Sequence, residues 1–109
     1  MFKLQKNPTF THAVTVMVPV DGGHDPQELT VRYRVVEMES VDRMISMKTQ
    51  DITDFLKAAV VEVSDLVDDN DAPLPWSDTL RDRLFAIYYI RIALVNGYIR
   101  AVMKARLGN

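Results

Sequence analysis

Two stretches near the N-terminus alternate between apolar and polar residues, and this period of two constrains the fold more than any other feature. The apolar positions are Val14, Val16, Val18 and Val20 in the first stretch, and Leu29, Val31, Tyr33 and Val35 in the second, which covers 27–36. Between them lies Asp21-Gly22-Gly23-His24-Asp25-Pro26, in which two glycines supply positive φ and the proline ends the turn. We expect an antiparallel β-hairpin, with Pro19 at an edge or a strand end because proline has no ladder donor.

A hairpin alone is marginally stable, so its valine face needs a cover. After Val36 the apolar spacing becomes helical, which predicts a short helix capped by Ser40 and a second helix near 51–66 capped by Asp51. The β-branched run Val60-Val61-Glu62-Val63 fits a strand as well as a helix, so the end of this second helix stays open.

The stretch 68–76 combines two prolines with acidic and amide residues, which predicts a loop. Ser77 can cap the next helix, and the chain is helical in character from Leu80 to about Lys104, with a break near Ala86 left open. These elements predict one domain over 1–109 with an α+β fold: an N-terminal antiparallel β-hairpin followed by a bundle of three to four α-helices.

The C-terminal helical segment is apolar on two faces. One face carries Leu84, Ile87, Leu94 and Ala101, and the opposite face carries Phe85, Tyr89, Ile92, Val95, Ile99 and Met103. A small domain has difficulty burying both faces, so we expect the second face to bind a partner, and Ile92, Val95 and Ile99 to lie in a homo-oligomer contact. Trp76 is a further candidate for partner binding, although it can also staple the entry of the last helices.

The sequence carries no pattern typical of catalysis or of a metal or cofactor site. It has no cysteine, and its two histidines, His12 and His24, have no metal-ligand spacing. The acidic run from Asp68 to Asp71 fails as a calcium loop, because starting at Asp69 puts Leu74 where glycine is needed. We therefore expect a protein that is not an enzyme and needs no cofactor.

Nucleic acid and membranes are also unexpected partners. The net charge is −2, and large apolar residues separate the basic residues of the last helix. The apolar run 85–95 is too short to span a bilayer and has Arg91 at its middle. The N-terminus lacks the apolar core of a signal peptide, which together with the missing cysteines predicts a cytoplasmic location.

Three segments resemble one known family. The opening Met1-Phe2-Lys3-Leu4-Gln5-Lys6-Asn7-Pro8-Thr9-Phe10-Thr11 before a valine-rich hairpin, the step Asp69-Asn70-Asp71-Ala72-Pro73-Leu74-Pro75-Trp76-Ser77, and the ending Lys104-Ala105-Arg106-Leu107-Gly108-Asn109 are similar to the tail assembly chaperones of long-tailed bacteriophages and prophages. One departure is Glu62-Val63-Ser64-Asp65, where relatives often carry glycine and tryptophan.

The resemblance implies a cytoplasmic factor of the bacterial host cell that binds the tape measure protein and keeps it soluble while the tail tube assembles. It brings no catalytic residues. The same hairpin and apolar helix also fit an alternative, a self-assembling structural component of the tail such as a tube or terminator subunit.

Overall fold

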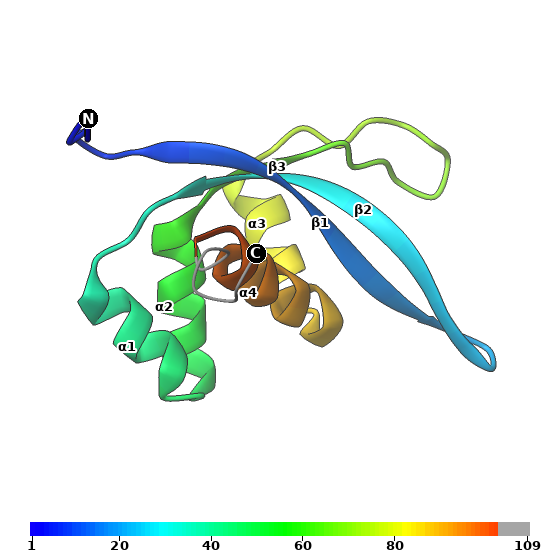
Figure 1. The fold of residues 1–109 in the computed structure, drawn as a ribbon. Helices are drawn as coiled ribbons and strands as arrows, with labels where there is room; N and C mark the ends of the chain where they lie inside the picture. The colour runs from blue at the N-terminus through cyan, green and yellow to red at the C-terminus, as the bar shows by residue number, and fades with distance from the viewer. Residues whose placement is uncertain (103–109) are drawn as a thin grey trace.

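A computed structural model describes residues 1–102 of the chain. It consists of β1 (Thr9–Val20), β2 (Gly23–Arg34), α1 (Met38–Ile45), α2 (Thr49–Ala59), β3 (Val60–Ser64), α3 (Asp78–Phe85) and α4 (Tyr88–Val102). The three strands form one antiparallel sheet in the order β1-β2-β3, and the helices lie on one side of it (Figure 1). The predicted α+β fold, an N-terminal hairpin followed by three to four helices, is confirmed, and β3 adds a third strand to the hairpin.

The hairpin is longer than the sequence predicts. β1 and β2 have 12 residues each, and Val20 pairs with Gly23, so the turn is only Asp21-Gly22. Gly22 alone of the two glycines has positive φ, at 76°. Pro26 does not end the turn but lies within β2 opposite Met17, a position that a strand tolerates when the missing N–H would face away from the neighbouring strand.

The alternation of the hairpin matches the burial of its side chains. Val14, Val16, Leu29, Val31 and Tyr33 are buried, whereas the residues between them on β1 are exposed. Val20 and Val35 are exposed, because Val20 lies at the hairpin tip and Val35 follows the end of β2. The hairpin from Pro19 to Glu28 is exposed throughout and extends past the helices (Figure 1).

The expected helix over 51–66 is wrong in its second half. α2 ends at Ala59, and the β-branched run that follows forms β3, which pairs with β2 through Val31 and Val63. Both of these valines are almost fully buried, so pairing at the sheet edge with burial against the helices outweighs the helical spacing of the run. The strand alternative left open by the sequence is therefore confirmed.

Two of the three predicted caps are wrong. α1 has Glu37 at its N-cap, and the Ser40 amide already donates to the Glu37 carbonyl at 3.0 Å inside the helix. α2 has Lys48 at its N-cap, and Asp51 lies in the first turn.

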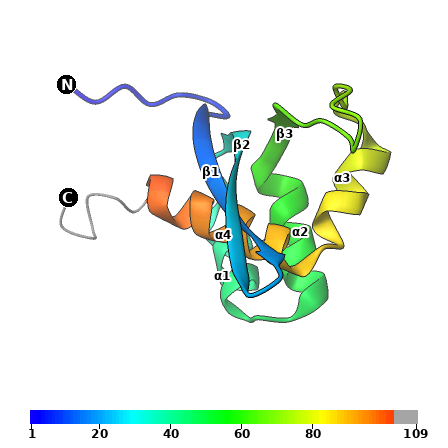
Figure 2. The ribbon, with the colours of Figure 1, turned by 90° about the vertical axis from the view of Figure 1, so that its right-hand side faces the viewer.

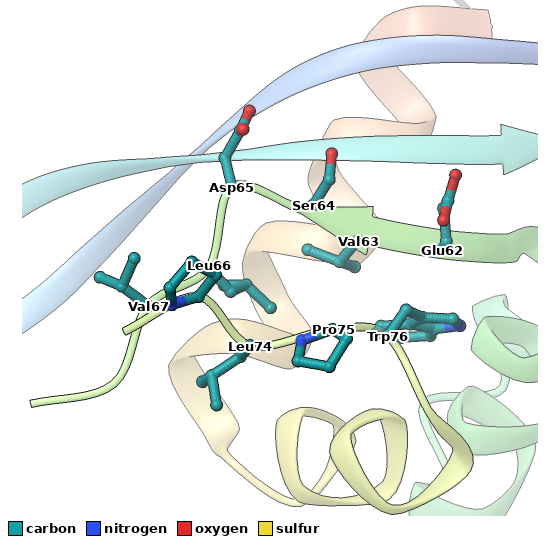
Figure 3. Close-up of a pocket in the computed structure, with 10 residues that line it drawn as sticks. Glu62, Val63, Ser64, Asp65, Leu66, Val67, Leu74, Pro75 and Trp76 are labelled. Carbon is teal, nitrogen blue, oxygen red and sulfur yellow. The ribbon is translucent and has the colours of Figure 1, made fainter. Parts of the chain in front are cut away.

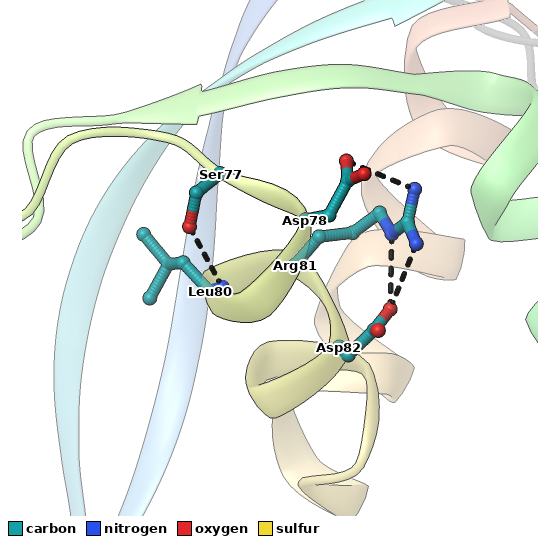
Figure 4. Close-up of polar contacts among 5 residues, drawn as sticks. All are labelled: Ser77, Asp78, Leu80, Arg81 and Asp82. Carbon is teal, nitrogen blue, oxygen red and sulfur yellow. Dashed lines mark hydrogen bonds and ion pairs between the residues drawn. The ribbon is translucent and has the colours of Figure 1, made fainter.

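The predicted cap at Ser77 is confirmed. The Ser77 hydroxyl accepts a hydrogen bond from the Leu80 amide at 3.1 Å (Figure 4). Arg81 lies between Asp78 and Asp82, with its closest approach to Asp82 at 3.0 Å. The start of α3 is therefore held by the Ser77 cap and by ion pairs within the helix.

The C-terminal helical segment is two helices. α3 and α4 meet at 98°, with the break at Ala86 and Ile87. No single helix in the part described is long and apolar enough to cross a membrane, although this bent pair passes the same test when its two members are taken together. The predicted helix end at Lys104 lies outside the described residues.

Candidate functional site

α4 lies beside the sheet (Figures 1 and 2) and approaches it closely at Gly97. A Cβ atom added to Gly97 would be 2.6 Å from Cγ2 of Val14 and 2.7 Å from the hydroxyl of Tyr33. That hydroxyl donates to the Leu94 carbonyl at 2.7 Å. Glycine has a low helix propensity, but the missing side chain of Gly97 lets α4 approach β1 and β2 closely.

The rotation of α4 about its axis is fixed from the other side. The Arg91 guanidinium donates to the Thr53 hydroxyl at 2.8 Å, to the Phe85 carbonyl at 2.7 Å and to the Thr49 carbonyl at 2.9 Å. Arg91 is therefore an internal link between α2, α3 and α4 rather than a surface cation. Tyr98, whose ring packs on Phe55 with centroids 5.2 Å apart, accepts from the Val36 amide at 3.1 Å.

These contacts leave one apolar row of α4 facing outward, which we call the α4 stripe: Tyr88, Ile92, Val95, Ile99 and Val102. Tyr88 is 77% exposed, Ile92 and Val102 are each 42% exposed, and Val95 and Ile99 are partly buried. The intervals along the row are four, three, four and three residues, which is the spacing of the apolar seam of a coiled coil. Such a row fits the apolar face of another helix.

The predicted second face divides at the bend between α3 and α4. Ile92, Val95 and Ile99 belong to the α4 stripe, but the placement of Phe85 with them is wrong. Phe85 is the last residue of α3 and is 2% exposed, because the 98° turn directs it into the core. Met103 lies outside the described residues. The break near Ala86 that the sequence left open is confirmed. Tyr88 and Val102 were not predicted, because the two apolar faces were assigned across that break.

Tyr89 and Ile92 also line a groove of about 680 Å³ between α4 and β1, which we call the β1–α4 groove. Its β1 wall runs from His12 to Pro19, and its α4 wall runs from Tyr88 to Arg100. Most of its accessible lining is apolar. The groove is continuous with the α4 stripe, since Tyr88 and Ile92 belong to both.

Trp76 lies in a separate place. With Leu66, Leu74 and Pro75 it lines a pocket of about 570 Å³ beside β3, whose rim carries Glu62 and Asp65 (Figure 3). Trp76 is partly buried and packs against the core. Trp76 is therefore not part of the surface formed by Tyr89 and Ile92.

The described residues offer few groups for chemistry. Within residues 1–102 no three His, Asp or Glu side chains gather as metal ligands, and no buried side-chain polar atom lacks a hydrogen-bond partner. Burial raises the pKa of the Tyr33 phenol above its ordinary range, which keeps it a neutral donor to Leu94. His12 and His24 both line the β1–α4 groove.

Comparison of the chain with protein-family models, with curated proteins and with solved structures found no match in any of the three.

Proposed function

We propose that this chain is a tail assembly chaperone of a long-tailed bacteriophage or prophage. In this role it binds the tape measure protein in the cytoplasm of the bacterial host and keeps it soluble until the tail tube encloses it. The proposal is supported by the resemblance of the three sequence segments and, in the structure, by one observation above all: the α4 stripe, an outward row of apolar residues at coiled-coil spacing.

The stripe has the properties that such a role requires. A tape measure protein presents long apolar helical surface before the tube surrounds it, and shielding that surface stabilises the soluble state by mass action. The stripe is shallow, because Val95 and Ile99 are already half covered by their own domain. A shallow contact gives modest affinity for each copy, so many copies can coat one long helix and still be released.

In the absence of the tape measure protein, we propose that a second copy covers the same stripe. Ile92, Val95 and Ile99 lie at its centre, and a row with seven-residue periodicity is complementary to another of its kind. The chaperone is then a homo-oligomer whose contact surface becomes available to its client by exchange.

The test is co-expression with the tape measure protein encoded by the same phage. We expect the chaperone to raise the soluble fraction of that protein and to co-purify with it. Ile92→Asp should abolish both effects, because a carboxylate cannot be buried in an apolar seam without a partner. Ile45→Asp is the matched control, since Ile45 is a 64% exposed isoleucine on α1, outside the stripe. Full activity of Ile92→Asp, or equal loss in both variants, would refute the role of the stripe.

The alternative function, a structural tube or terminator subunit, draws on the exposed hairpin, which extends beyond the helices. Mass spectrometry of finished virions separates the two. A structural subunit is present there in many copies, whereas a chaperone is absent.

A further inference from the structure

β1 is an edge strand, and two contacts establish which of its residues turn their backbone toward β2. The Val35 amide donates to the Pro8 carbonyl at 3.0 Å, one step beyond the pair Thr9 and Arg34. The Thr30 carbonyl accepts from the Ser64 hydroxyl at 3.4 Å, so it points away from its β1 partner Ala13. Because an antiparallel ladder alternates, the even-numbered residues of β1 bond β2, and the odd-numbered ones direct N–H and C=O to the open edge.

The prolines of the hairpin agree with this assignment. Pro19 is an odd-numbered residue of β1, and Pro26 is opposite the odd-numbered Met17, so neither would have given its amide to the β1–β2 ladder. Ala13, Thr15 and Met17 therefore present three N–H and three C=O groups along the edge. Among the described residues, no other strand pairs with this side of β1.

The same three residues form one wall of the β1–α4 groove. The opposite wall, on α4, is largely apolar, and its polar members are Asn96 and Arg100. The basic and imidazole side chains of the lining are His12, His24 and Arg100, and none of the described lining residues is Asp or Glu. The groove thus combines an open strand edge, a largely apolar wall and one positive charge, that of Arg100, with no carboxylate in its described lining.

We propose that the β1–α4 groove binds an extended segment of a partner protein, which adds to β1 as a fourth strand and carries a carboxylate near Arg100. A helix does not fit this site, because its backbone groups are bonded internally and cannot satisfy those of Ala13, Thr15 and Met17. An added strand directs alternate side chains against the apolar wall of α4, and these should be β-branched or aromatic. This inference is independent of the proposed function.

The open edge of β1 predicts which amides of this strand exchange fast with solvent. In the free protein, measured by NMR, the amides of Val14 and Val16 are protected by the β2 ladder and those of Ala13, Thr15 and Met17 exchange fast. The probe is a seven-residue peptide of alternating valine and threonine with glutamate at its centre. We expect it to slow exchange at Ala13, Thr15 and Met17 and to leave the other edge of the sheet unchanged. Unchanged exchange at these three amides in about 1 mM peptide, a concentration that detects weak binding, overturns the proposal.

A matched pair of variants tests the backbone bond itself. Thr15→Pro removes an outward N–H and no bond to β2, whereas Thr15→Val alters the side chain and keeps the N–H. We expect Thr15→Pro to weaken peptide binding about tenfold or more, because it loses one hydrogen bond and adds a ring at the edge. Thr15→Val should bind the peptide as tightly as the parent chain. Equal binding by the two variants would exclude strand addition.

The charge preference is tested without touching the backbone, which keeps the proposal testable if Thr15→Pro fails to fold. Arg100→Glu should weaken binding of the glutamate peptide several-fold at low salt, while Arg83→Glu, on α3 and outside the groove, should not. The same peptide with lysine at its centre should show the reverse preference. An unaltered affinity in Arg100→Glu overturns the carboxylate assignment.

Protection of Ala13, Thr15 and Met17 that rises with protein concentration without peptide would assign the edge to a second copy and also overturn the proposal.

Discussion

Replacing Gly97 by alanine adds one methyl group, which favours the helix but overlaps with buried neighbours. Alanine is a better helix former than glycine, which alone predicts a gain of about 1 kcal/mol in the interior of α4. The new Cβ, however, would lie 2.6 Å from Val14 and 2.7 Å from the Tyr33 hydroxyl, both well inside van der Waals contact. The sign of the change in unfolding free energy decides which effect is larger.

The surroundings of Gly97 have little freedom to move. Val14 is 3% exposed, and Tyr33 is fully buried in a cluster with the rings of Phe10 and Tyr98. Overpacking of a tight core costs about 1–3 kcal/mol, and displacing the Tyr33 hydroxyl from the Leu94 carbonyl costs about 1 kcal/mol more. After subtraction of the propensity gain, we expect Gly97→Ala to lower stability by about 1–3 kcal/mol.

Urea unfolding followed by circular dichroism measures this change, and a double-mutant cycle locates its cause. In a Tyr33→Phe background one of the two clashing atoms is absent, so Gly97→Ala should cost about 1 kcal/mol less there than in the parent chain. A stabilising Gly97→Ala, or a cost that is the same in both backgrounds, would show that α4 does not lie against β1 as described.

Three further predictions concern the links that hold the helices. Because burial raises the pKa of Tyr33, the native state keeps its proton where the unfolded chain loses it, so stability should fall as pH rises above about 10; urea melts of Tyr33→Phe should lack this fall. Ser77→Ala should cost about 1 kcal/mol in thermal melts, whereas Ser40→Ala, which removes no cap, should change stability by less than about 0.5 kcal/mol. Arg91→Met should destabilise by about 2 kcal/mol and speed amide exchange in the first turns of α2.

The sequence predicts those elements whose local pattern agrees with their final environment. The hairpin has a strict period of two, and the Ser77 cap opens a helix after a proline-rich loop, so both are recognisable without tertiary contacts. The run 60–63 is different, because its residues suit either structure. The run becomes a strand because it pairs with β2, where Val31 is the partner of Val63. No local feature of the sequence shows that β2 lies beside it.

Only part of the α4 stripe could be predicted from the sequence, because the sequence does not show the sharp bend between α3 and α4. A break near Ala86 was left open, but the apolar faces were assigned across it, which put Phe85 in line with Ile92. The bend at Ala86 instead moves Phe85 into the core and starts a new helix at Tyr88. Counted from that start, the row of four- and three-residue intervals from Tyr88 to Val102 becomes visible.

α4 is apolar on most of its circumference because it faces the sheet on one side and the core on another, and carries the α4 stripe on the third. Gly97 lies directly against the sheet, and Ala93, Leu94 and Tyr98 are buried in the core. The remaining row, the α4 stripe, is only partly covered by its own domain: Tyr88, Ile92 and Val102 are exposed, whereas Val95 and Ile99 pack against the core. Because exposed apolar surface of this kind costs solubility, the regular spacing of the row supports the proposal of a helical partner.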